Sequence, residues 1–219
     1  METSTGLARL GPLEQLRGGR LGRRFLQLAL GLLLYGISMA MMVRGNLGLS
    51  PWDALHMGLT DHLPLSFGSV VVVVSFIVLL LWVPLREIPG LGTLLNAIAI
   101  GLVANVFLAA FGPPASLSAR LFLTIGGALL CGVATPLYIG AQLGQGPRDG
   151  LMTGLHRVTG LSLRLVRTSI ELTALLLGLL LGGLDVLGIG TIVFALSIGP
   201  MTQALLPFML IPVRMRGKG

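Results

Sequence analysis

Two four-residue segments of the chain carry the residue types that could bind a small solute. They read Ser50-Pro51-Trp52-Asp53 and Gly146-Pro147-Arg148-Asp149. In both, proline suits the first turn of a helix, and the residue before it can cap the free backbone amides. The aspartate then falls near the positive end of the helix dipole, where a carboxylate is favourable. The pattern therefore predicts two helices, over 51–62 and 147–158, that begin in the same way.

These two helices are too short and too polar to cross a bilayer, which needs about 20 apolar residues. They could lie on the membrane surface as amphipathic helices, with Trp52 at the level of the lipid headgroups. Alternatively, they could dip into the bilayer from opposite faces and direct their first N–H groups toward one polar site. In the second arrangement, both four-residue starts are candidates for substrate binding.

Three further polar residues within apolar stretches are candidates for the same site. Glu171 is the only carboxylate predicted well inside a membrane span, where a charged side chain is costly and often functional. Arg167, one helical turn earlier, could instead pair with Glu171 at the membrane surface. Asn105 and Gln203 are neutral, and each could either join two helices by hydrogen bonds or line a cavity.

The elements that carry these residues are expected to be membrane-spanning helices. Only 11% of the 219 residues are charged and 54% are hydrophobic, whereas a soluble domain has about 25% charged residues. This composition excludes a soluble enzyme and a disordered protein, and the single cysteine, Cys131, excludes a disulfide framework. We therefore predict an all-α, polytopic transmembrane bundle with six spans near 25–43, 68–85, 91–111, 121–141, 165–184 and 188–209.

The basic residues predict how these spans are oriented. The net charge is +7, and the arginines gather before the first span, around the loop after the fourth span, and after the last span. Because short basic segments stay in the cytoplasm, both termini are predicted to be cytoplasmic, in a plasma membrane. No basic stripe is interleaved with aromatic residues, so the expected partner is the lipid bilayer and not nucleic acid.

The two halves of the chain also resemble each other. Residues 47–55 match 143–151 at an offset of 96, and 90–93 match 188–191 at an offset of 98, which also pairs Asn105 with Gln203. Because each half holds three spans, the second half must be inverted in the membrane relative to the first, as in many secondary transporters. We predict a basic tail at 1–24, a first repeat at 25–111, a linker at 112–120, a second repeat at 121–209 and a basic tail at 210–219.

Three strings in the chain carry a resemblance to a known family. They are Gly48-x-x-Pro51-Trp52-Asp53-Ala54-Leu55, Gly146-Pro147-x-Asp149-Gly150-Leu151 and Leu187-Gly188-Ile189-Gly190-Thr191. On these strings the chain resembles the YczE/YyaS/YitT family of small bacterial membrane proteins, over about 25–210. The resemblance implies a multi-spanning plasma-membrane protein of a kind often described as a transporter, and it implies no particular substrate.

The sequence predicts no enzyme chemistry, cofactor or metal site. It contains no P-loop, no H-E-x-x-H motif and no G-x-S-x-G motif, and His56 and His62 are not at a helical ligand spacing. The preferred hypothesis is a secondary transporter or permease of a small solute. Two alternatives stay open: a membrane scaffold or regulator that transports nothing, and a substrate-capture subunit of a larger transport complex.

Overall fold

The computed structural model of the protein describes residues 11–213, and within that range it contains helices and no strands. This confirms the predicted all-α fold. Residues 1–10 and 214–219 of the two predicted basic tails lie outside the described residues. The helices are α1 (Pro12–Arg17), α2 (Leu21–Gly45), α3 (Pro51–Thr60), α4 (Phe67–Leu80), α5 (Trp82–Leu85), α6 (Leu91–Ala110), α7 (Leu117–Gly140), α8 (Pro147–Thr159), α9 (Leu163–Gly182), the 3₁₀ turn η1 (Leu184–Val186) and α10 (Ile189–Met209).

Six helical segments of the described chain are long and apolar enough to cross a membrane, as predicted. They are α2, α4 together with α5, α6, α7, α9 and α10. Their outward faces are apolar: Leu180 on α9 is 81% exposed and Phe208 on α10 is 88% exposed. Such large exposed hydrophobic side chains suit contact with lipid tails, since a soluble surface of this kind would aggregate.

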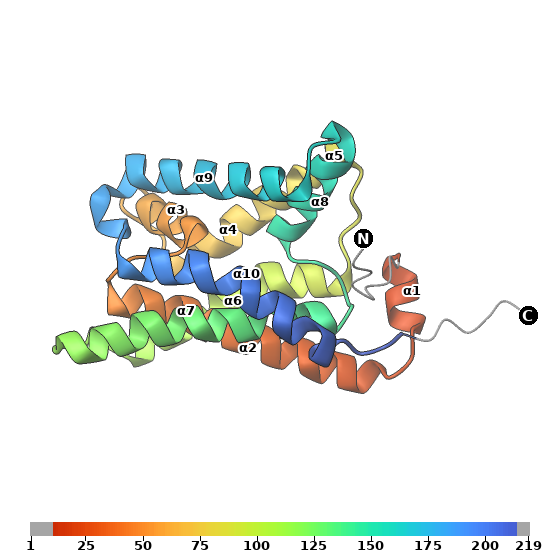
Figure 1. The fold of residues 1–219 in the computed structure, drawn as a ribbon, viewed down its shortest axis with the longest axis horizontal. Coiled ribbons are helices and arrows are strands. Elements are labelled where there is room, and N and C mark those ends of the chain that lie inside the picture. The colour runs from red at the N-terminus through yellow and green to blue at the C-terminus, as the bar shows by residue number, and fades with distance from the viewer. Residues whose placement is uncertain (1–10, 214–219) are drawn as a thin grey trace, which may run out of the picture.

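The long helices run roughly along one axis and form layers (Figure 1). Helices α2 and α7 pack against each other on one side, with α6 against α2 and α10 against α7. Helix α9 lies on the opposite side, with α3 and α4 beneath it. The two Pro-led short helices lie at opposite ends of the bundle, α3 at one and α8 at the other. Helix α1 and the C-terminal end of α10 lie at the same end as α8.

The core between α2 and α7 depends on small residues that let the two backbones approach closely. A Cβ atom at Gly31 would lie 2.7 Å from the backbone nitrogen of Tyr138, and one at Gly127 would lie 2.8 Å from the carbonyl oxygen of Ser38. Gly31 and Gly127 are equivalent at the offset of 96. The same type of close contact therefore recurs in both halves, as expected where helices pack in a membrane.

Hydrogen bonds between the halves are also reciprocal. Nε of Arg24 donates to the carbonyl oxygen of Ala141 at 2.8 Å, and Nε of Arg120 donates to that of Gly45 at 3.0 Å. Arg24 and Arg120 differ by 96 in number, as do Gly45 and Ala141. The sequence predicted Arg24 to lie in the N-terminal tail, but α2 begins at Leu21 and therefore includes Arg24. The side chain of Arg24 is completely buried, and its guanidinium is held by backbone carbonyl oxygens such as that of Ala141.

A second reciprocal pair joins the loops before the short helices to the starts of other helices. The carbonyl oxygen of Leu47 accepts from the backbone of Gly190 at 2.8 Å, and that of Leu143 accepts from Gly92 at 2.7 Å. These four residues are equivalent by the offsets of 96 and 98. Residues that the two offsets make equivalent therefore form matching hydrogen bonds between the halves.

The two halves differ most in how their outer helices pack. In the first half, α4 packs on α6, where a Cβ atom at Gly101 would lie 2.3 Å from the carbonyl oxygen of Gly68. The equivalent Gly199 on α10 has open space around it, with nothing within 4 Å. Helix α9 packs instead on α3, where Gly178 faces the backbone of Ala54. The equivalent helices of the two halves therefore pack differently in the outer layer.

Candidate functional site

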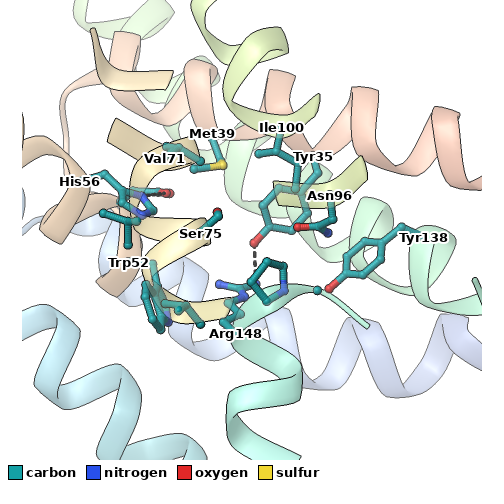
Figure 2. Close-up of a pocket in the computed structure, with 15 residues that line it drawn as sticks. Tyr35, Met39, Trp52, His56, Val71, Ser75, Asn96, Ile100, Tyr138 and Arg148 are labelled. Atoms are coloured by element: carbon teal, nitrogen blue, oxygen red, sulfur yellow. Dashed lines mark hydrogen bonds and ion pairs between the residues drawn. The ribbon is translucent and has the colours of Figure 1, made fainter. Parts of the chain in front are cut away.

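The starts of α3 and α8 meet at one pocket in the interior of the bundle (Figure 2). Trp52 and Asp53 line it from α3, and Pro147 and Arg148 line it from α8. The cavity has a volume of about 60 Å³, enough for a few water molecules or a small solute. Of the two arrangements predicted for the short helices, the geometry supports the one in which both starts face a shared site.

Glycines turn the chain into each helix start. Gly48 has a φ of +107° and Gly144 a φ of +128°, values that side chains with a Cβ atom rarely adopt. Both residues also touch the other half, Gly48 against Gly188 and Gly144 against Thr93. A bulkier residue at either position would strain the turn and push apart the segments that place the site.

The start of α3 is capped by its own side chains. The hydroxyl of Ser50 accepts from the backbone nitrogen of Asp53 at 3.2 Å and donates to the Oδ2 atom of that residue at 2.7 Å. Nδ1 of His56, one turn further on, lies 3.7 Å from Oδ1 of Asp53. Asp53 and His56 are 4% and 5% exposed. The α3 side of the pocket is therefore a buried cluster of three polar residues.

The start of α8 is built differently, because glycine replaces the capping serine. Gly146 provides no side-chain cap, and Asp149 instead accepts a hydrogen bond from the hydroxyl of Tyr138. Arg148 donates from Nη2 to the hydroxyl of Tyr35 at 2.5 Å, and its guanidinium carbon lies 5.5 Å from the centre of that ring (Figure 2). The α8 side therefore brings a cation and two tyrosines to the pocket.

Apolar side chains, the amide of Asn96 and the hydroxyl of Ser75 complete the pocket wall. Val71, Val74 and Ile100 contribute apolar surface from α4 and α6, and the amide of Asn96 lies beside Tyr35 (Figure 2). A pocket of this kind, largely apolar with a few oriented polar groups, is typical of sites that bind small molecules. Its side chains can bind and orient a solute.

The structure brings most of the predicted site residues together. Trp52, Asp53, Gly146, Pro147 and Arg148 line the pocket directly. Ser50, Pro51 and Asp149 form the layer behind it, where Ser50 and Asp149 bind to pocket residues by the hydrogen bonds given above.

Glu171 does not reach this site, which corrects the candidate set. Its carboxylate pairs with Arg167 on the same helix, with 3.0 Å between Oε1 and Nε. Both side chains are partly exposed, and neither lines the pocket. The pairing follows from their spacing of four residues, which brings the two side chains to the same face of α9.

Asn105 and Gln203 also lie outside the pocket. Asn105 accepts from the backbone of Gly68 and donates to the hydroxyl of Ser66, both at 2.8 Å. It therefore joins α6 to α4, the structural alternative of the two roles considered for it. Gln203 is exposed on α10. The equivalent part of α6 is covered by α4, whereas this part of α10 has no such covering helix within the described chain.

Five polar residues of the pocket were not predicted as site residues from the sequence: Tyr35, His56, Ser75, Asn96 and Tyr138. His56 looked like a residue of a polar helix face, and Asn96 like one that joins helices. The two tyrosines carried a usable signal, because they are the only tyrosines in the chain and both fall within predicted spans. A buried tyrosine usually needs a hydrogen-bond partner. The polar residues that follow the prolines at the starts of α3 and α8 were the available candidates.

Comparisons with known proteins place the chain among proteins without assigned functions. The profile of a family of unknown function, DUF6198, matches residues 22–207. An uncharacterized protein of Haemophilus influenzae is 41% identical over 80% of each chain. From Bacillus subtilis, the uncharacterized membrane protein YczE is 32% identical over 81% of this chain and 82% of its own, and the uncharacterized protein YyaS is 26% identical over 84% and 92%. No solved structure matches.

Proposed function

The chain belongs to the DUF6198 family of membrane proteins of unknown function, and we propose that it moves a small solute across the bacterial plasma membrane as a secondary transporter or permease. One observation carries this proposal: the Pro-led starts of α3 and α8, which come from opposite ends of the bundle, line the same interior pocket. Paired short helices of this kind, in corresponding positions of two repeats, surround the substrate sites of many secondary transporters.

The proposal includes the orientation and the kinship predicted from the sequence. Both termini are cytoplasmic, the second three-span repeat is inverted relative to the first, and the chain is a distant relative of the YitT proteins. The reciprocal contacts of Arg24 and Arg120 support a two-fold relation between the halves. With no P-loop in the sequence, the driving force in this proposal is a gradient of the solute or of a coupled ion.

Transport can be tested with the purified chain in proteoliposomes. Uptake of four labelled solutes of different charge is measured: nitrate, glycine, choline and glycerol. We expect one class to accumulate above protein-free liposomes, and Asp53→Asn and Asp149→Asn each to lower that uptake at least tenfold. Asparagine keeps the shape of aspartate, so both variants should insert normally. Its neutral amide oxygen accepts the hydrogen bonds of Ser50 or Tyr138 more weakly than a carboxylate does, so the groups around the pocket are held less firmly.

Asp185→Asn is the matched control, because Asp185 is an exposed carboxylate in the turn before α10 and lies away from the pocket. Its uptake should equal that of the unmodified protein. Uptake that never exceeds that of empty liposomes, or equal uptake by all three aspartate variants, would contradict transport through this pocket. A scaffold protein would give the first of these results.

A further inference from the structure

We propose that the pocket binds a small planar oxyanion, such as a carboxylate, and that the guanidinium of Arg148 is its main partner. This inference rests on the transport function proposed above, because it names the class of solute that the same pocket takes. It is carried by the unequal use of charged groups in the pocket: the carboxylates have partners within the protein, whereas the cation has most of its donors free.

Arg148 uses only a small part of its hydrogen-bonding capacity. A guanidinium has five N–H donors and remains charged in proteins, but Arg148 donates one hydrogen bond among the described residues, to the hydroxyl of Tyr35. No carboxylate oxygen of the described chain lies within 4.0 Å of its nitrogens. Most of its donors therefore remain available to an anion, in a pocket that Val71 and Val74 also line.

The two nearby carboxylates do not serve as the missing partner. Asp53 accepts from the Ser50 hydroxyl at 2.7 Å and lies 3.7 Å from Nδ1 of His56. Asp149 accepts from the hydroxyl of Tyr138. Both are therefore held by groups on their own side of the pocket. A cationic solute would have to compete for these carboxylates, whereas an anion would meet donors that nothing else occupies.

A second donor points to the same ligand. Asn96 is 7% exposed and lines the pocket, and its amide makes no hydrogen bond to any described residue. It lies next to the start of α8, since a Cβ atom at Gly146 would be 3.3 Å from its Nδ2 atom. Buried amides are almost always hydrogen-bonded. An anion between Arg148 and Asn96 would satisfy both side chains at the positive end of α8.

The difference between the two helix starts places this anion site on one side of the pocket. At equivalent positions, α3 has Ser50 and Trp52 where α8 has Gly146 and Arg148. Serine closes the α3 start with its hydroxyl, and glycine leaves the α8 start without a side-chain cap. The guanidinium fork matches planar, two-oxygen anions, and the cavity of about 60 Å³ has room for a small one.

The test is binding at equilibrium, measured without transport. The thermal unfolding midpoint of the detergent-purified full chain is followed with increasing sodium acetate or sodium nitrate, and sodium chloride, whose anion has no planar pair of oxygens, keeps the ionic strength constant. A ligand that binds the folded state raises the midpoint in a saturable way. We expect this for the unmodified protein, and at least tenfold weaker apparent affinity for Arg148→Gln and for Asn96→Ala.

Two arginine variants complete the design. Arg164→Gln removes an exposed arginine at the start of α9, away from the pocket, and should bind like the unmodified protein. Arg148→Lys keeps the charge but loses the planar fork, so it should bind more weakly than arginine and more tightly than glutamine. If Arg148→Gln does not fold, unchanged affinity in a folded Arg148→Lys overturns the proposal.

The outcomes show whether an anion binds at Arg148 and, if so, which class of anion it is. A response to acetate alone indicates an organic carboxylate, and an equal or larger response to nitrate indicates an inorganic oxyanion; both support the proposal. No saturable response to either salt, or the same response in Arg148→Gln, overturns it. Arg148-dependent binding without uptake of any solute would contradict the proposed transport and support the anion site. Uptake of choline that is unchanged in Arg148→Gln would support transport and contradict the anion site.

Discussion

At the scale of single residues, Arg24 and Arg148 show two uses of a cation within a largely apolar bundle. Arg24 is completely buried and donates to the carbonyl oxygens of Gln15, Ala141 and Gln142 at 2.5 to 2.8 Å. Two of these acceptors follow the last turn of α7, where carbonyl groups have no partner within the helix and the dipole favours a cation. The charge of Arg24 is thus fully used by the fold, whereas Arg148 has one hydrogen-bond partner.

This difference predicts a stability role for Arg24 in particular. Arg24→Gln should lower the free energy of unfolding by about 3 kcal/mol, because each buried carbonyl left without a donor costs about 1–3 kcal/mol. The neighbouring Arg23→Gln is the control, since Arg23 is exposed on the same helix, and it should change stability little. The unfolding of both variants in mixed micelles at increasing denaturant gives the comparison. Equal losses would show that Arg24 contributes only its charge to the surrounding field.

At the scale of elements, the local features of the fold were predictable and the partners of each element were not. Six apolar segments and two Pro-led helix starts can be read from neighbouring residues, and the structure has them within a few residues. Which helix covers which depends on contacts between distant residues. Helix α9 packs on α3, and the partly exposed side chain of Glu171 lies on a face of α9 that is away from the pocket.

The pocket was predictable to the same extent. The residues that begin α3 and α8 were found because helix starts have a local pattern. Tyr35 and Tyr138 come from the middle and the end of two long helices, and their contacts with Arg148 and Asp149 are set by the close packing of α2 on α7. No spacing within either helix indicates that contact.

The unequal packing of the outer helices gives a prediction with an internal control. Gly101→Leu should lower stability by about 1–3 kcal/mol, the usual cost of overpacking, because its Cβ atom would meet the backbone of Gly68. Gly199→Leu, at the equivalent position of the second half, should be tolerated, since that glycine has open space around it. Unfolding midpoints of the two variants measure the difference. Equal destabilisation would mean that α9 packs on α10 as closely as α4 packs on α6.

At the scale of the whole molecule, the halves share a centre of reciprocal contacts but differ in charge and outer packing. The hydrogen bonds that the backbone of Gly190 donates to Leu47, and that of Gly92 to Leu143, join the two halves. Around this centre, one short helix begins with serine and tryptophan and the other with glycine and arginine. The two halves therefore supply different groups to the one pocket.

The inversion of the halves can be tested by labelling two equivalent positions. Leu63 and Thr159 differ by 96 in number, and both are exposed beyond or at the end of the short helices, at opposite ends of the bundle. Each is replaced by cysteine in a Cys131→Ser background, which removes the only native cysteine. A membrane-impermeant maleimide should label Leu63→Cys in whole cells and Thr159→Cys only after permeabilisation. Labelling of Thr159→Cys alone in whole cells would reverse the orientation but keep the inversion. Labelling of both in whole cells would place the two ends on one side, and the paired helix starts could then not approach the pocket from opposite faces of the membrane.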